Sequence, residues 1–164
     1  MRRTTISLLM TAAMLAACSA EAPPEATDDA PVVLKGGQWA LTKTYTAYKS
    51  AMTATPEDAA KIGTKTETSI CLPVAADGKA DPNALAGDDG TDCKYKETYM
   101  SNGRFVGALA CKAGAGTSEL QIEGSYKADS LTFAVNTAKT VGGNTALSTS
   151  YSLAGKRTGE CKPG

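Results

Sequence analysis

Histidine is absent from all 164 residues of the chain. Its absence removes the commonest general base, the commonest zinc ligand and the side chain whose ordinary pKa lies nearest neutrality. The chain also has no Gly-x-Ser-x-Gly sequence, which holds the nucleophile of many hydrolases, and no Cys-x-x-Cys pair. We therefore expect a protein that is not an enzyme and that binds neither a cofactor nor a metal ion.

Net charge and large aromatic side chains are also scarce. The chain carries 17 basic and 17 acidic residues, and its aromatic residues are one Trp, two Phe and six Tyr. Because Lys and Arg are scattered, no basic surface is available to bind phosphates, and we expect no nucleic-acid partner. Abundant Thr, Ser, Gly and Ala suit antiparallel sheets with a modest core better than a thick helical core.

The only long apolar run lies at residues 4–15 and follows Arg2 and Arg3. It is too short to stay in a bilayer as a permanent helix, and it ends at Leu15-Ala16-Ala17-Cys18. This ending resembles the lipobox of bacterial lipoproteins. The resemblance implies that residues 1–17 are a signal peptide and that Cys18 becomes the acylated N-terminus, carrying palmitate-type chains. An ordinary secretory signal followed by a chance cysteine is the alternative.

Residues 18–31 are predicted to be the lipidated cysteine and a disordered tether, because they are rich in Pro, Ala and acidic residues and have almost nothing to bury. Two or three acyl chains would anchor the protein stably. Ser19 follows the cysteine, where an aspartate would favour retention in the inner membrane. We therefore expect a periplasmic location on the outer membrane rather than on the inner membrane.

Residues 32–164 are predicted to form a single β domain. Seven segments alternate apolar and polar side chains at hairpin spacing, which predicts an antiparallel meander. No helix is long enough to cover a sheet face, so we expect the sheet to curl into an open barrel or fold into a sandwich. Thr55 and Asp81 each stand directly before a proline, and a short helical turn is predicted to follow each of them. The predicted strands are 38–48, 65–72, 93–100, 104–111, 117–127, 131–139 and 145–156.

The segment 93–111 is predicted to be a hairpin at the centre of this meander. A three-residue loop, Ser101-Asn102-Gly103, would keep one face apolar. A two-residue Asn102-Gly103 turn is the alternative, and it would place Lys94 and Lys96 on that face. The favoured register opposes Tyr99 with Phe105, Tyr95 with Leu109, and Cys93 with Cys111.

With Cys18 acylated, four cysteines remain in an oxidising compartment, which predicts two disulfides. The hairpin register favours Cys93–Cys111, and this leaves Cys71–Cys161. The alternative pairs Cys71 with Cys93 and Cys111 with Cys161.

The loop 73–92 is rich in aspartate and raises the question of calcium. It lacks the alternating acids, central glycine and terminal glutamate of an EF-hand. We therefore expect its carboxylates to be solvated turn residues. The acids concerned are Asp77, Asp81, Asp88, Asp89 and Asp92.

Several short motifs occur in a familiar order. Gly-Gly-Gln-Trp39 opens a strand, Cys71-Leu72-Pro73 follows, and Arg157-Thr158-Gly159-Glu160-Cys161 closes the chain. Together with Cys93 and Cys111, these motifs resemble the domain of unknown function 3617 family of small exported proteobacterial proteins. The family typically ends in Arg-Ile-Gly-Asp-Cys, so this chain departs at Thr158 and Glu160. The resemblance implies an exported β domain and no known activity.

These features predict a membrane-anchored envelope lipoprotein that acts as a non-enzymatic binding or interaction module. The alternatives are a carrier of a small apolar ligand within the curled sheet, or an inhibitor of an envelope enzyme. Glu97, predicted to lie opposite Gly107 on the hairpin, is the one carboxylate on an apolar face, and we expect it at a solvated rim. The predicted ligand or partner face consists of Trp39, Tyr45, Tyr95, Tyr99, Phe105 and Tyr126.

Overall fold

The chain forms one seven-stranded antiparallel sheet in a computed structural model that describes residues 31–50 and 55–161. Two short helices and one 3₁₀ turn accompany the sheet, so the all-β class, the seven strands and the short helical turns are confirmed. The signal peptide, Cys18 and the tether lie outside the described residues. The elements are β1 (Gly37–Lys49), α1 (Pro56–Lys61), β2 (Lys65–Leu72), α2 (Pro82–Ala86), the 3₁₀ turn η1 (Gly87–Asp89), β3 (Thr91–Ser101), β4 (Arg104–Ala113), β5 (Gly116–Tyr126), β6 (Ser130–Val141) and β7 (Asn144–Gly159).

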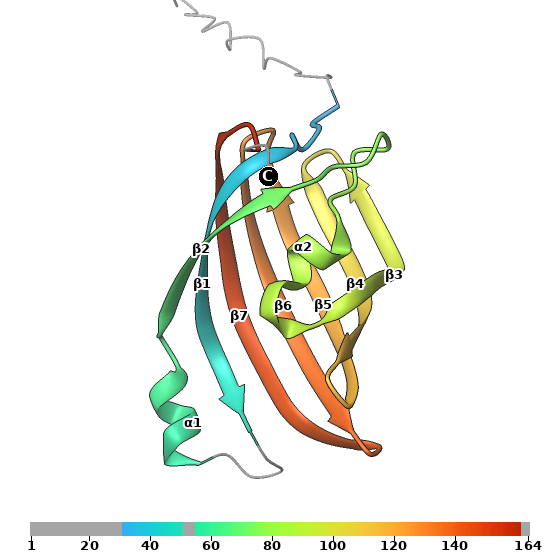
Figure 1. The fold of residues 1–164 in the computed structure, drawn as a ribbon. Coiled ribbons are helices and arrows are strands. Elements are labelled where there is room, and N and C mark those ends of the chain that lie inside the picture. Colours follow the sequence, from blue (N-terminus) through green and yellow to red (C-terminus); the bar gives the residue numbers. More distant parts are fainter. Residues whose placement is uncertain (1–30, 51–54, 162–164) are drawn as a thin grey trace, which may run out of the picture.

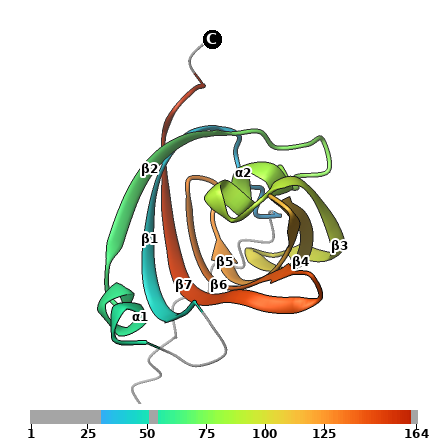
Figure 2. The same ribbon diagram turned by 60° about the horizontal axis from the view of Figure 1, so that its bottom comes forward.

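The strand order across the sheet is β2-β1-β7-β6-β5-β4-β3. Strands β3 to β7 form the predicted meander, and β1 pairs with β7 to add the β1–β2 hairpin. The sheet curls strongly, and α2 lies between the two edge strands, β2 and β3 (Figures 1 and 2). The fold is therefore the open barrel rather than the sandwich. The prediction that residues 93–111 lie at the centre of the sheet is wrong, because β3 is an edge strand.

Both helices begin at the predicted caps. The Thr55 hydroxyl accepts a hydrogen bond from the Asp58 amide, and the Asp58 carboxylate accepts one from the Thr55 amide. This reciprocal arrangement is a capping box. At α2 the Asp81 carboxylate accepts a hydrogen bond from the Asn83 amide, which stabilises one turn of helix before Gly87. None of the helices in the described part of the chain is long or apolar enough to span a membrane.

Large side chains fill the concave face of the sheet. Trp39 is fully buried, and Phe105 and Phe133 pack with their ring centroids 5.1 Å apart. Gly124 lies between these two phenylalanines in the pairing of β4, β5 and β6. A Cβ atom there would lie 2.1 Å from the Thr132 carbonyl oxygen, so only glycine permits this close approach. We call the region around Trp39, Phe105 and Phe133 the apolar core.

The register of the β3–β4 hairpin differs from the favoured prediction near the turn. Asn102 and Gly103 have φ values of 47° and 75°, as a two-residue type I′ turn requires. Met100 therefore pairs with Phe105, and Tyr99 lies on the convex face. An irregularity between Tyr95 and Glu97 then shifts the register by one residue, so that Tyr95 pairs with Leu109 as predicted.

This β-bulge explains why the favoured prediction was wrong at one end of the hairpin and right at the other. With the two-residue turn alone, Lys94 and Lys96 would face inward. The extra residue in β3 shifts the register by one, so that in the part of the strand near the cysteines the apolar side chains face inward again. Tyr99 lies on the turn side of the bulge, keeps the register that the two-residue turn sets, and is 59 % exposed.

Both predicted disulfides are present. Cys93 and Cys111 join β3 to β4 with Cα atoms 4.0 Å apart, and the Cys93 amide donates to the Asn83 side chain rather than to β4. Cys71 and Cys161 join β2 to the segment after β7, with Cα atoms 5.3 Å apart. Since β2 and β7 lie on opposite sides of β1, this bridge spans three strands at one end of the sheet.

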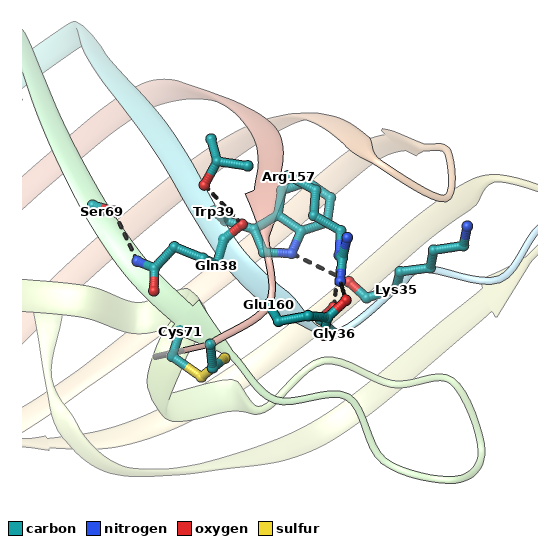
Figure 3. Close-up of a disulfide and its surroundings, with 10 residues drawn as sticks. Lys35, Gly36, Gln38, Trp39, Ser69, Cys71, Arg157 and Glu160 are labelled. Atoms are coloured by element: carbon teal, nitrogen blue, oxygen red, sulfur yellow. Dashed lines mark hydrogen bonds and ion pairs between the residues drawn. A yellow bond between two sulfur atoms is a disulfide. The ribbon is translucent and has the colours of Figure 1, made fainter. Parts of the chain in front are cut away.

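Hydrogen bonds support the same end of the sheet (Figure 3). The Trp39 indole donates to the Lys35 carbonyl oxygen at 3.2 Å, and the Arg157 guanidinium donates to the Gly36 carbonyl oxygen at 2.8 Å. Arg157 also pairs with Glu160. The Gly-Gly-Gln-Trp and Arg-Thr-Gly-Glu-Cys motifs are therefore neighbours in space and hold the two ends of the domain together.

Candidate functional site

A cluster of charged and polar side chains lies on the concave face, away from the apolar core, with Asp89 and Tyr151 buried and two lysines partly exposed. It contains Lys43 of β1, Tyr151 of β7, Lys139 of β6 and Asp89 at the end of η1. We call these four residues the inner polar cluster. The three sheet residues belong to adjacent strands, and Asp89 reaches them from the connection between α2 and β3.

The Asp89 carboxylate is the centre of the cluster and only 7 % exposed. Its Oδ2 atom accepts hydrogen bonds from Lys43 Nζ at 3.0 Å and from the Tyr151 hydroxyl at 2.8 Å. Lys139 Nζ lies 4.0 Å from Asp89 Oδ1 and donates to the Asp88 carbonyl oxygen at 3.4 Å. Lys139 is therefore held less tightly than Lys43.

Aromatic rings complete the surroundings of Lys43. Its Nζ lies 4.0 Å from the centroid of the Tyr151 ring and 5.0 Å from that of Tyr45, distances at which a cation is attracted to a ring face. Burial first, and the Asp89 carboxylate second, raise the pKa of the Tyr151 phenol well above its usual range. Tyr151 is therefore a hydrogen-bond donor at neutral pH.

Three hydroxyl groups beside the cluster are buried and have no hydrogen-bond partner among the described residues. They belong to Ser118, Thr137 and Thr149. Thr137 pairs with Thr149 across β6 and β7, and Ser118 pairs with Lys139 across β5 and β6. Buried hydroxyls usually have partners, so this region has unused capacity for hydrogen bonds.

A narrow slit leads to the cluster between α2 and strands β1, β2 and β7. It has a volume of about 120 Å³, and Lys43 and Tyr151 belong to its lining. Its other walls are mostly apolar. They include Leu41, Ile70, Leu85 and Leu153.

A second, wider groove of about 430 Å³ lies under the loop between β2 and α2. Tyr95 lines it, and the Tyr95 hydroxyl donates to the Ala80 carbonyl oxygen at 2.8 Å. Val74 and Pro82 supply apolar walls, whereas Asp77 lies at the same groove. It contains no buried charge, and Tyr95 is held by the loop itself.

The predicted aromatic face is not one surface. Tyr45 is half-buried beside the inner polar cluster, Tyr95 lines the groove, and Tyr99 is exposed on the convex side. The other three residues are buried packing residues. They are Trp39, Phe105 and Tyr126.

The sequence reasoning missed the inner polar cluster. It expected Asp89 to be a solvated turn residue, which is wrong because Asp89 is buried in an ion pair. A signal was available in the strands. Lys43 alternates with Leu41 and Tyr45 on the inward side of β1, and Lys139 is likewise inward on β6.

Glu97 of β3 is one more residue that the sequence analysis singled out. Glu97 lies opposite Ala108 rather than Gly107, and it is exposed as expected. Within the described residues no group of three His, Cys, Asp or Glu side chains is arranged to hold a metal ion.

Comparison with known proteins gives one match. No curated protein and no solved structure matches the chain. The family model described as protein of unknown function (DUF3617) matches residues 34–161, which include every strand and both disulfides. The chain therefore belongs to the DUF3617 family.

Proposed function

We propose that the protein is a lipoprotein of the cell envelope, anchored through an acylated Cys18, whose β domain is a non-enzymatic binding module. The observation that carries the binding role is the slit lined by the partly buried Lys43, which is paired with the buried Asp89. Concave sites with apolar walls and a few polar groups are typical of small-molecule binding. The anchor is supported by the Leu15-Ala16-Ala17-Cys18 sequence and by the two disulfides, which suit an oxidising compartment.

A non-enzymatic role is supported by the chemistry of the inner polar cluster. Lys43 is ion-paired with Asp89, and the pKa of Tyr151 is raised. Neither group is therefore a ready base or nucleophile near neutral pH. The cluster offers hydrogen-bond donors and positive charge, which serve recognition.

The interior argues against a carrier of a large apolar ligand. The apolar core is filled by its own side chains, and the slit has only about 120 Å³, whereas sites for drug-sized ligands have roughly 300–1,000 Å³. If the protein carries a ligand, this interior favours a small molecule that binds at the slit.

An interaction with an envelope protein, including inhibition of an enzyme, is the second candidate. Among the described strands β2 pairs only with β1, so one edge of its eight residues has unpaired backbone groups. A partner strand can add to such an edge. Lys65 and Glu67 on β2 are the charged side chains that would influence which partner fits.

The anchor is tested by replacing Cys18. In the native host, Cys18→Ala should move the protein from the membrane fraction to the soluble periplasmic fraction, because no acyl chain can be attached. Ser19→Ala is the matched control and should leave the protein in the membrane fraction. Unchanged membrane association of Cys18→Ala would disprove the lipid anchor.

A further inference from the structure

We propose that Lys43, Lys139 and Tyr151 form a binding site for the carboxylate of a short aliphatic acid, and that Asp89 takes the place of this carboxylate in the protein without ligand. The inference rests on the proposed binding role and names the class of ligand. The Asp89 carboxylate shows which chemical group the three strand residues accept, because they hold it with two hydrogen bonds and a longer ion pair.

The charges of the site favour an anion. Two lysine ammonium groups converge on the Asp89 carboxylate, so the four residues of the inner polar cluster carry one excess positive charge. Asp88 is exposed and belongs to the lining of the slit, where it adds a negative charge. Lys139 makes only a 3.4 Å hydrogen bond and a 4.0 Å ion pair. The Lys139 side chain is 26 % exposed, so its ammonium group is partly solvated and has capacity to bind a second anionic oxygen.

Buried hydroxyls lie on the strands of Lys139 and Tyr151 and on the neighbouring strand β5, although they do not line the slit. Ser118, Thr137 and Thr149 are each more than nine-tenths buried, and within the described residues none of their hydroxyls has a partner. Thr149 lies two residues before Tyr151 on the inward side of β7, and Ser118 lies opposite Lys139. A carboxylate beside Lys139 could accept hydrogen bonds from these hydroxyls.

The slit determines the rest of the ligand. Its apolar walls suit an aliphatic chain, while Lys43 and Tyr151 lie where the carboxylate would bind. A volume of about 120 Å³ is well below the roughly 300–1,000 Å³ of sites for drug-sized ligands. The chain must therefore be short, and a phospholipid is too large.

Glycines flank the connection that carries Asp89 and allow its backbone to change conformation. Gly87, with φ of 51°, and Gly90 flank Asp88 and Asp89. Glycine lowers the cost of changing backbone conformation at these positions. Asp89 can therefore turn toward solvent while Leu85 and Ala86 of α2 stay packed.

The test measures hexanoate binding by the full-length processed protein in non-ionic detergent, using calorimetry. Asp89→Asn removes the internal competitor, so hexanoate should bind at least tenfold more tightly than to the wild type. Asp92→Asn is the matched control, since Asp92 is an exposed carboxylate paired with Lys112 in the same region. It should bind hexanoate as the wild type does. Adding Lys43→Met to Asp89→Asn should reduce the affinity at least tenfold.

Four results would overturn the inference, and they bear differently on the proposed function. Equal hexanoate affinity of folded Asp89→Asn and wild type shows that Asp89 does not occupy the site. Equal affinity for hexanol and hexanoate in Asp89→Asn shows a slit that binds apolar chains without using charge, so the binding role survives. Binding of neither probe removes the small-molecule role as well. If Asp89→Asn fails to fold, Lys139→Met in the otherwise wild-type protein should lower hexanoate affinity, and unchanged affinity rejects the site.

Discussion

The apolar core and the inner polar cluster occupy the same concave face but are built in opposite ways. Around Phe105 and Phe133, glycine at position 124 lets large side chains pack closely. Around Asp89, a carboxylate and several hydroxyls are buried beside two partly exposed lysines, and three of the hydroxyls have no partner in the described part of the chain. Burying charges and unpaired polar groups costs free energy. The apolar core therefore stabilises the fold, whereas the polar cluster reduces stability at a place suited to binding.

The largest effect is expected from the apolar core. Phe105→Ala should lower the free energy of unfolding by about 4 kcal/mol, because it removes a buried ring and leaves a cavity. Urea unfolding followed by circular dichroism measures the change.

Tyr99→Ala is the control in the same hairpin. Tyr99 is 59 % exposed, so its replacement should change the free energy by less than about 0.5 kcal/mol. Similar losses for the two variants would contradict the register with the two-residue turn.

The sequence predicted the apolar core better than the polar cluster for a physical reason. Alternation along one strand identifies an inward face, and the cysteines identify which strands are joined. The pairing of β1 with β7 joins residues about 100 positions apart, such as Lys43 and Leu153, and periodicity carries no information about that pairing. Nothing in the local sequence distinguishes buried Asp89 from exposed Asp88, because only the path of η1 separates them.

The hairpin register illustrates the same limit on a smaller scale. The Asn102-Gly103 pair favours a type I′ turn, and the alternation near the cysteines requires the other register. The β-bulge between Tyr95 and Glu97 satisfies both requirements. Each local signal was therefore correct, but a single uninterrupted register could not satisfy the two together.

An intermediate effect is expected at the polar cluster. Lys43→Met should lower the free energy of unfolding by about 2 kcal/mol, because the Asp89 carboxylate stays buried with a weaker set of partners. The double variant Lys43→Met with Asp89→Leu should recover to within about 1 kcal/mol of the wild type, since apolar replacement of a buried ion pair is often neutral. A double variant as unstable as the sum of its single variants would show that Lys43 and Asp89 are not energetically coupled, and would contradict this account of the ion pair.

The smallest expected effect tests whether the buried hydroxyls beside the inner polar cluster lower the free energy of unfolding. Thr149→Val keeps the shape of the side chain and removes a buried hydroxyl without a partner among the described residues. It should raise the free energy of unfolding by about 1 kcal/mol, whereas Thr132→Val, on the exposed side of β6, should change it by less than about 0.5 kcal/mol. In the Asp89→Asn background the same Thr149→Val change should weaken hexanoate binding. If Thr149→Val raises stability and lowers hexanoate affinity, the polar region serves binding and the apolar core serves stability. A loss of stability would show that the Thr149 hydroxyl already has a hydrogen-bond partner in the folded protein.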